Sequence, residues 1–134
     1  MGKYQNLETD AFSIFASTPW KNENIKTFPA NFIELSPGNE FIRVSVIPSG
    51  YGINLTSISG VLIIDIFTSA GNGPKKTSLI ADKLDSYLVG KSVSTISGNR
   101  TQFSNSSLSY VGLDTVNSAL YRATYSIPFN YFGV

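Results

Sequence analysis

The stretch from residue 59 to residue 90 constrains the fold most, because an apolar segment, a glycine turn and an amphipathic segment follow one another there. Six of the seven residues from Val61 to Phe67 are apolar and four are β-branched, a composition that favours a strand. Apart from Asp65, both faces of this strand are apolar, so both need a cover. We expect the helices of the chain to cover one face, and a second layer or another subunit to cover the other.

Glycines and a proline mark a turn between this strand and a helix. Gly71 and Gly73 accept positive φ angles without steric cost, and Pro74 suits the first turn of a helix. Apolar side chains then recur at three- and four-residue spacing up to Gly90, a residue that readily ends a helix. The pattern predicts an amphipathic helix over residues 75–89.

The rest of the chain predicts one more helix and several more strands. Apolar spacing indicates a helix over residues 6–17, and a polar segment, 91–107, is interpreted as a short edge strand plus loop. Alternating side chains predict strands over residues 40–48, 108–116 and 119–127. We therefore expect one α+β domain, residues 1–134, whose mostly antiparallel sheet has four to five strands, with two helices packed on one face.

A long connection over residues 18–39 contains three prolines and several apolar residues, which indicates an ordered loop packed over the core. Its Trp20 is the only tryptophan of the chain. We interpret Trp20 as a buried anchor, and a platform for a ligand is the alternative.

Two further segments are candidates for contact with another subunit. Residues 49–58 are expected to form a hairpin tip, where Tyr51, Ile53 and Leu55 alternate with polar residues. Exposed, these three side chains would suit addition to a neighbour's sheet, whereas folded back they would belong to the core. The final stretch, 128–134, carries three aromatic residues and should pack on its own core or on a partner.

Composition restricts the possible chemistry. The chain has no cysteine and no histidine, so the usual nucleophile–base pairs and zinc sites cannot be assembled. A net charge of +1 gives no bias toward nucleic acid, and no apolar run is long enough for a membrane span. Asp65 needs a partner such as Arg43 or Arg122, and a structural or intersubunit ion pair is favoured over a catalytic acid. We predict no enzyme activity, no cofactor and no metal.

Taken together, these residues resemble the phage tail terminator-like family. The resemblance is carried by the helix near the N-terminus, the aromatic loop from Trp20 to Phe28, the strand Phe41–Pro48, the segment Ser59–Phe67, and the Gly71–Gly73 turn before a helix containing Ile80-Ala81-Asp82-Lys83-Leu84. It covers roughly residues 7–90.

The resemblance implies a structural virion protein of the tail neck, assembled in the host cytoplasm. Such proteins form a ring, usually hexameric, on the head-proximal end of the tail tube, stop its polymerisation and meet a head-completion or connector protein. DNA passes through the lumen without sequence recognition. Under this hypothesis the subunit contacts are expected to involve Arg43, Tyr51, Ile53, Leu55, Asp65, Arg122, Phe129, Tyr131 and Phe132.

An alternative from another class is a small β-rich module that binds carbohydrate or another ligand. It would use Trp20 and the tyrosines as stacking platforms. Aromatic side chains lined up on one exposed face would favour this alternative, and aromatic side chains at subunit contacts would favour the terminator.

Overall fold

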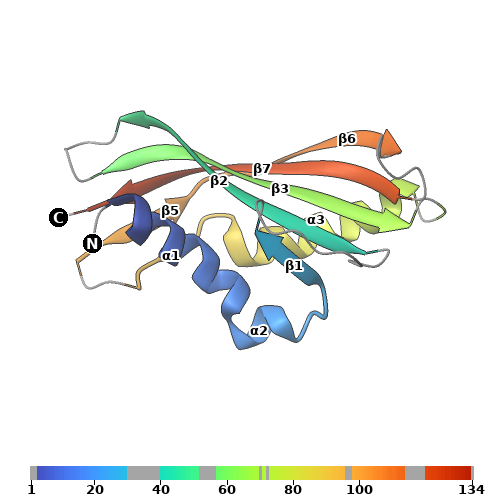
Figure 1. Cartoon of the computed structure of the whole chain (residues 1–134), viewed down its shortest axis with the longest axis horizontal. Helices are drawn as coiled ribbons and strands as arrows, with labels where there is room; N and C mark the ends of the chain where they lie inside the picture. The colour runs from blue at the N-terminus through green and yellow to red at the C-terminus, as the bar shows by residue number, and fades with distance from the viewer. Residues whose placement is uncertain are drawn as a thin grey trace.

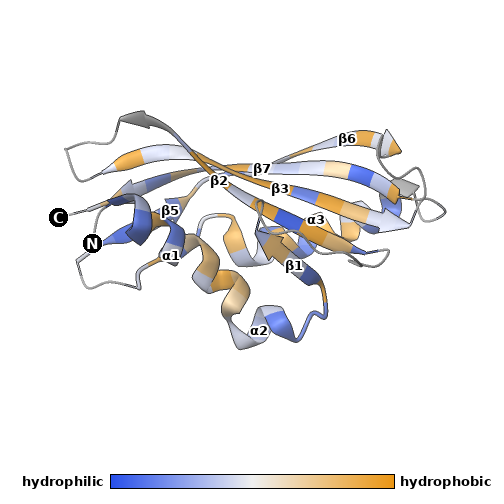
Figure 2. Cartoon of the chain, viewed as in Figure 1, coloured by the Kyte–Doolittle hydropathy of each residue, from blue (hydrophilic) through white to orange (hydrophobic). Residues whose placement is uncertain are grey.

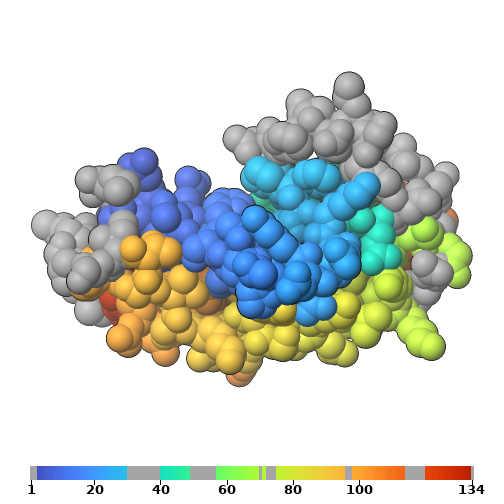
Figure 3. Space-filling view, turned by 90° about the horizontal axis from the view of Figure 1, so that it is seen from below, coloured from blue at the N-terminus to red at the C-terminus, as the bar shows by residue number. Residues whose placement is uncertain are grey.

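The protein is an α+β fold in which the helices lie on one side of a curled sheet. A computed structural model describes residues 3–29, 40–51, 57–69, 71, 73–95, 98–113 and 120–133. These residues form three helices and seven strands. Figure 1 shows the helices below the sheet, and Figure 3 shows the same side in space-filling form, with the N-terminal helices packed beside β1 and the third helix.

Ten elements follow one another along the chain. They are α1 (Lys3–Ala16), α2 (Thr18–Lys21), β1 (Lys26–Pro29), β2 (Phe41–Tyr51), β3 (Ile58–Ser69), α3 (Gly73–Leu88), β4 (Ser92–Val93), β5 (Arg100–Phe103), β6 (Ser107–Leu113) and β7 (Leu120–Phe132). The strand order is β1-β2-β3-β7-β5-β4, and β6 also pairs with β7. Among the described strands, β1 and β2 pair in parallel and the other pairs are antiparallel.

The structure confirms a mostly antiparallel sheet and corrects the number of elements. Four to five strands and two helices were predicted, whereas the described residues contain seven strands and three helices. The missed elements are short: β1 has four residues, β4 has two and α2 has four. Such elements are too short for periodicity to reveal, and their pairing partners lie elsewhere in the chain. The loop predicted over 18–39 therefore contains α2 and β1.

The last strand is also longer than predicted, because β7 continues through Pro128 to Phe132. On one edge of β7, β6 pairs with residues 121–126 and β5 pairs with residues 129–132. Pro128 lies between these two ladders on that edge, where its lack of an N–H breaks neither of them. The aromatic stretch that was predicted to be a tail thus supplies residues 128–132 of a central strand.

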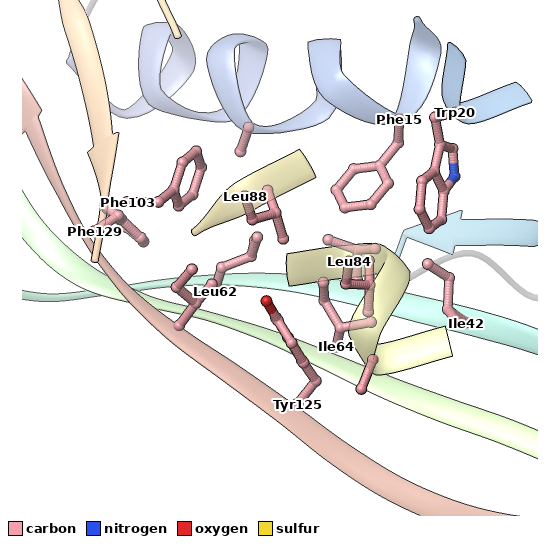
Figure 4. Packing of buried hydrophobic residues seen from close by; sticks show 14 of the residues in the cluster. Phe15, Trp20, Ile42, Leu62, Ile64, Leu84, Leu88, Phe103, Tyr125 and Phe129 are labelled. Atoms are coloured by element: carbon pink, nitrogen blue, oxygen red, sulfur yellow. The ribbon is translucent and has the colours of Figure 1, made fainter. Parts of the chain in front are cut away.

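The core lies between the helices and one face of the sheet. Burial alternates along β3, where Leu62, Ile64 and Ile66 are fully buried. Leu84 and Leu88 of α3 pack against this face, as Figure 4 shows. Figure 2 shows the corresponding bands of apolar and polar residues along the strands. This alternation fixes which face the helices cover and leaves the other face of β3 to residues of mixed polarity.

Two glycines meet specific backbone demands. Gly60 lies so close to its neighbour strand that an added Cβ would be 2.3 Å from the carbonyl oxygen of Ile47 and 2.9 Å from the Phe129 ring. Gly90, which was predicted to end this helix, follows α3 with φ of 70°, the left-handed conformation that glycine adopts readily. Glycine at these positions allows β2 and β3 to pair closely and α3 to end before β4.

A tyrosine–carboxylate contact ties α3 to β7. The hydroxyl of the buried Tyr125 points toward α3 (Figure 4) and donates a hydrogen bond to Asp85 Oδ1 at 2.7 Å. Ser106 Oγ donates to the same oxygen at 2.6 Å. Burial, and secondly the Asp85 carboxylate, raise the pKa of Tyr125 above the ordinary tyrosine value of 10.0.

This raised pKa predicts a loss of stability in alkali. The folded state keeps the Tyr125 proton at a pH where the unfolded state releases it, so this contribution is full below about pH 10 and declines above it. We expect the free energy of unfolding, measured in urea at about pH 8 and about pH 11, to fall at the higher pH. Tyr125→Phe should flatten the decline and Tyr110→Phe, at an exposed site, should not. An equal decline in the Tyr125→Phe variant would contradict this assignment.

Candidate subunit interface on the open face of the sheet

The sheet face opposite the helices, here called the open face, carries side chains of mixed character, most of them half-buried. Its members alternate with core residues along three neighbouring strands and are Arg43, Ser45 and Ile47 of β2, Val61, Ile63 and Asp65 of β3, and Arg122, Thr124 and Ser126 of β7. Among the described residues no helix lies on this face (Figure 1). It therefore offers an apolar strip next to charged groups, without a cover from these elements.

An ion pair occupies the centre of the open face. Arg122 Nη2 lies 3.1 Å from Asp65 Oδ1, and Thr124 Oγ1 donates to the same oxygen at 3.2 Å. The Asp65 side chain is 17% exposed and that of Arg122 is 36% exposed, so the pair is only partly screened by water. Asp65 thus has a partner in the fold, as its position in an apolar strand required.

Arg43 belongs to the same cluster without bridging Asp65. The two residues are direct partners in the β2–β3 register, but the ion pair of Asp65 is formed with Arg122. Instead, the Arg43 and Arg122 guanidinium groups lie 5.5 Å and 5.7 Å from the centroid of the Phe67 ring. This ring stacks on Phe41 with centroids 4.6 Å apart. The cluster therefore holds two cations and one anion, and its surplus positive charge is available to an acidic group of a partner.

The structure brings together three of the predicted interface residues and separates the others. Arg43, Asp65 and Arg122 form the cluster on the open face. Phe129 and Tyr131 are 2% and 1% exposed, so their prediction as contact residues is wrong: they point into the core of their own chain. The physical reason is that side chains of β7 continue to alternate past Pro128, which directs these two rings toward the helices.

The remaining predicted interface residues have different outcomes. Phe132 is half-buried at the end of β7, on the same side of that strand as the open face. Tyr51 is the last residue of β2, and of it only the backbone is described. Ile53 and Leu55 lie outside the described residues, so the proposal that the 49–58 hairpin makes contacts stays a prediction.

Trp20 is an anchor, as its interpretation favoured. Its side chain is 1% exposed, it meets Phe15 and Tyr87 edge-on with ring centroids 5.3 Å away in each case, and its indole N–H donates to Thr27 Oγ1 at 2.9 Å. The alternative of a binding module therefore lacks the stacking platform that it assigned to Trp20.

The sequence reasoning missed an exposed apolar edge. Three residues of β6, Tyr110, Val111 and Leu113, are 52%, 56% and 56% exposed. The sequence did contain a signal for this edge. The segment was predicted to be a strand, and its residues 107–113 include no charged residue and no proline. Edge strands of soluble proteins usually carry charged residues or proline, which prevent unwanted pairing.

Within the ranges that the structure describes, no group of three or more acidic, histidine or cysteine side chains has the arrangement of a metal site. No helix in those ranges is long and apolar enough to cross a membrane. The buried carboxylate of Asp10 and the half-buried carboxylate of Asp65 both accept hydrogen bonds from side chains of the fold.

Comparison with known proteins adds information about the fold alone. No protein-family model and no curated protein matches this sequence. A solved structure whose name states no function is similar to the chain with a TM-score of 0.65 and 16% sequence identity. The similarity covers 98% of this chain and 94% of the other, so the whole α+β fold occurs in another protein.

Proposed function

We propose that this protein is a structural subunit of a phage tail, of the tail terminator type. Copies would form a ring on the head-proximal end of the tail tube, stop its polymerisation and provide the tail side of the junction with a head-completion or connector protein. DNA would pass through the lumen without sequence recognition. The observation that carries the proposal is the open face, where half-buried apolar residues and an ion pair lie without a helix to cover them among the described residues.

The composition of the open face supports contact with protein. Val61 and Ile63 form its apolar strip, and each gains free energy when it is removed from water, roughly 25 cal/mol per Å² of apolar surface. The Asp65–Arg122 pair next to the strip is partly desolvated already, so a partner that covers it removes only the remaining water. An apolar centre with charged groups beside it is typical of surfaces that bind another protein.

The low charge of the whole chain supports the same proposal. Only 14% of the residues are charged, compared with about 25% in an average soluble domain. A ring buries two different surfaces of every subunit, because each copy contacts its neighbours head to tail. A subunit with so few charged residues can lose that much surface without leaving many charges unpaired. The resemblance of residues 7–90 to tail terminators supplies the particular class.

A charge on the open face should prevent ring formation. Ile63→Lys places an ammonium group in the middle of the apolar strip, and Leu79→Lys is the matched control on α3, at an exposed site on the helix side. We expect the ring to be lost in the first variant and kept in the second, with both folded by circular dichroism. Light scattering measures the mass, and electron microscopy of mixtures with tail tube protein from the same genome shows whether tube ends are capped. Rings that persist in Ile63→Lys, or tubes that wild-type protein leaves uncapped, would contradict the proposal.

A further inference from the structure

The strand β6 has one edge without a partner among the described residues. It pairs with β7 through residues 107–113 on its other side, and no described strand lies beyond it in the sheet. Alternate N–H and C=O groups along this edge therefore point away from the sheet, as they do at every sheet edge. The contact between the Tyr110 hydroxyl and Ser78 Oγ holds β6 against α3, so the edge is fixed in place.

The side chains of β6 suit this edge to pairing. Val111 and Leu113 are each 56% exposed, and the strand contains no charge and no proline that would repel another strand. Its one irregularity is a shift of register between Tyr110 and Gly112. An edge of this composition is a template for a further strand, in which backbone hydrogen bonds give affinity and the exposed apolar residues add buried area.

The strand at the opposite edge of the sheet, β1, is in register with β6 across the three strands between them. Pairing runs straight across five strands along one row, through Tyr110, Ala123, Ile66, Ile42 and Thr27. The next row contains Ser109, Thr124, Asp65, Arg43 and Phe28. A copy placed beside the first in the same orientation would therefore bring its β1 to the level of the free edge of β6.

Strand direction agrees with such a joint. β1 runs parallel to β2, and each further step to β3, β7 and β6 reverses the direction, so β1 and β6 run in opposite directions. Head-to-tail repetition keeps this relation and makes the joint antiparallel, as in most of this sheet. The uncharged β6 presents no charge that would repel Lys26 of β1.

We propose that β6 of one copy pairs with β1 of the next copy, so that the sheet is continuous across the subunits. The occupant of the free edge is a second copy of this chain, and the joint is heterologous. A heterologous joint with a rotation can close into a ring. This inference rests on the proposed function and adds the two sheet edges to the open face as contact surfaces of the ring.

Disulfide cross-linking tests this joint directly, because the chain contains no cysteine. Lys26 is exposed on β1, and strand pairing places Gly112 of β6 on the same row across the sheet. Val111, the neighbour of Gly112, is exposed and is therefore the position chosen on β6. We expect the double variant Lys26→Cys/Val111→Cys to form a ladder of dimer, trimer and higher species on a non-reducing gel after mild oxidation. An equal mixture of the two single variants should form dimers only, and each single variant by itself should stay monomeric on the gel.

Two results would overturn the joint. Dimers of Val111→Cys alone would show that two β6 strands pair with each other, which closes a dimer and leaves no ring. A double variant that is oligomeric by light scattering but forms no cross-link would place the contact on other surfaces. The proposed function is judged separately. A cross-linked ladder that does not bind tail tube ends supports the joint and rejects the terminator function. Capped tubes without cross-links support the terminator function and reject the joint.

Discussion

Replacing Trp20 by alanine is expected to lower the free energy of unfolding by about 3–5 kcal/mol, the usual cost of emptying a buried tryptophan site. The indole is 1% exposed and lies edge-on to both Phe15 of α1 and Tyr87 of α3. Its loss would open a cavity where three helices meet. Since small domains are stable by only about 5–15 kcal/mol, the variant should be close to unfolding at physiological temperature. Urea denaturation followed by circular dichroism measures the change.

The variant Trp20→Phe separates packing from hydrogen bonding in the same site. Phenylalanine retains an aromatic ring against Phe15 and Tyr87 but cannot donate to Thr27 Oγ1. We expect it to keep more than half of the stability that Trp20→Ala loses. A loss below about 1 kcal/mol in Trp20→Ala would mean that the helices do not depend on this anchor.

Asp10→Ala is the second substitution with a large expected effect, of about 3 kcal/mol. The Asp10 carboxylate on α1 is 1% exposed. It accepts hydrogen bonds from the backbone N–H of Thr95 at 3.0 Å, from the Thr95 hydroxyl, and from Thr101 Oγ1 at 2.8 Å. Alanine would leave the buried Thr101 hydroxyl and the two Thr95 donors without this acceptor and would detach α1 from the β4–β5 region. Urea denaturation measures the loss, and hydrogen exchange at the Thr95 amide should become faster.

Asn at the same position is the matched control. Its amide oxygen can still accept from the Thr95 N–H, and its NH₂ group can donate to the Thr101 hydroxyl. Asp10→Asn should therefore cost less than half as much as Asp10→Ala. If the two variants were equally unstable, the charge of Asp10 would matter more than its hydrogen bonds.

The long elements of this fold could be predicted because each has a pattern of its own. The apolar run from Val61 to Phe67 lies within β3, and the spacing of Ile80, Leu84 and Leu88 matches the buried side of α3. Asp65 was recognised as unusual because a carboxylate in such a strand must have a partner. The ion pair between Asp65 and Arg122 confirms that expectation.

Features that depend on distant pairing could not be predicted in the same way. β1 forms because β2 offers Phe41–Val44 as a partner, and the four residues Lys26–Pro29 show no pattern that predicts a strand. The burial of Phe129 and Tyr131 depends on β5, which pairs beyond Pro128 and extends β7. Whether an apolar residue is core or interface is decided by such long-range pairing, and local composition does not contain that information.

The mass of the wild-type protein in solution tests the central claim most directly, namely that copies of this chain join through surfaces that its own helices do not cover. Light scattering at several protein concentrations should give a closed species whose mass is a fixed multiple of the 14.5 kDa chain. A single species of 14.5 kDa at every concentration, with and without tail tube protein, would contradict the account.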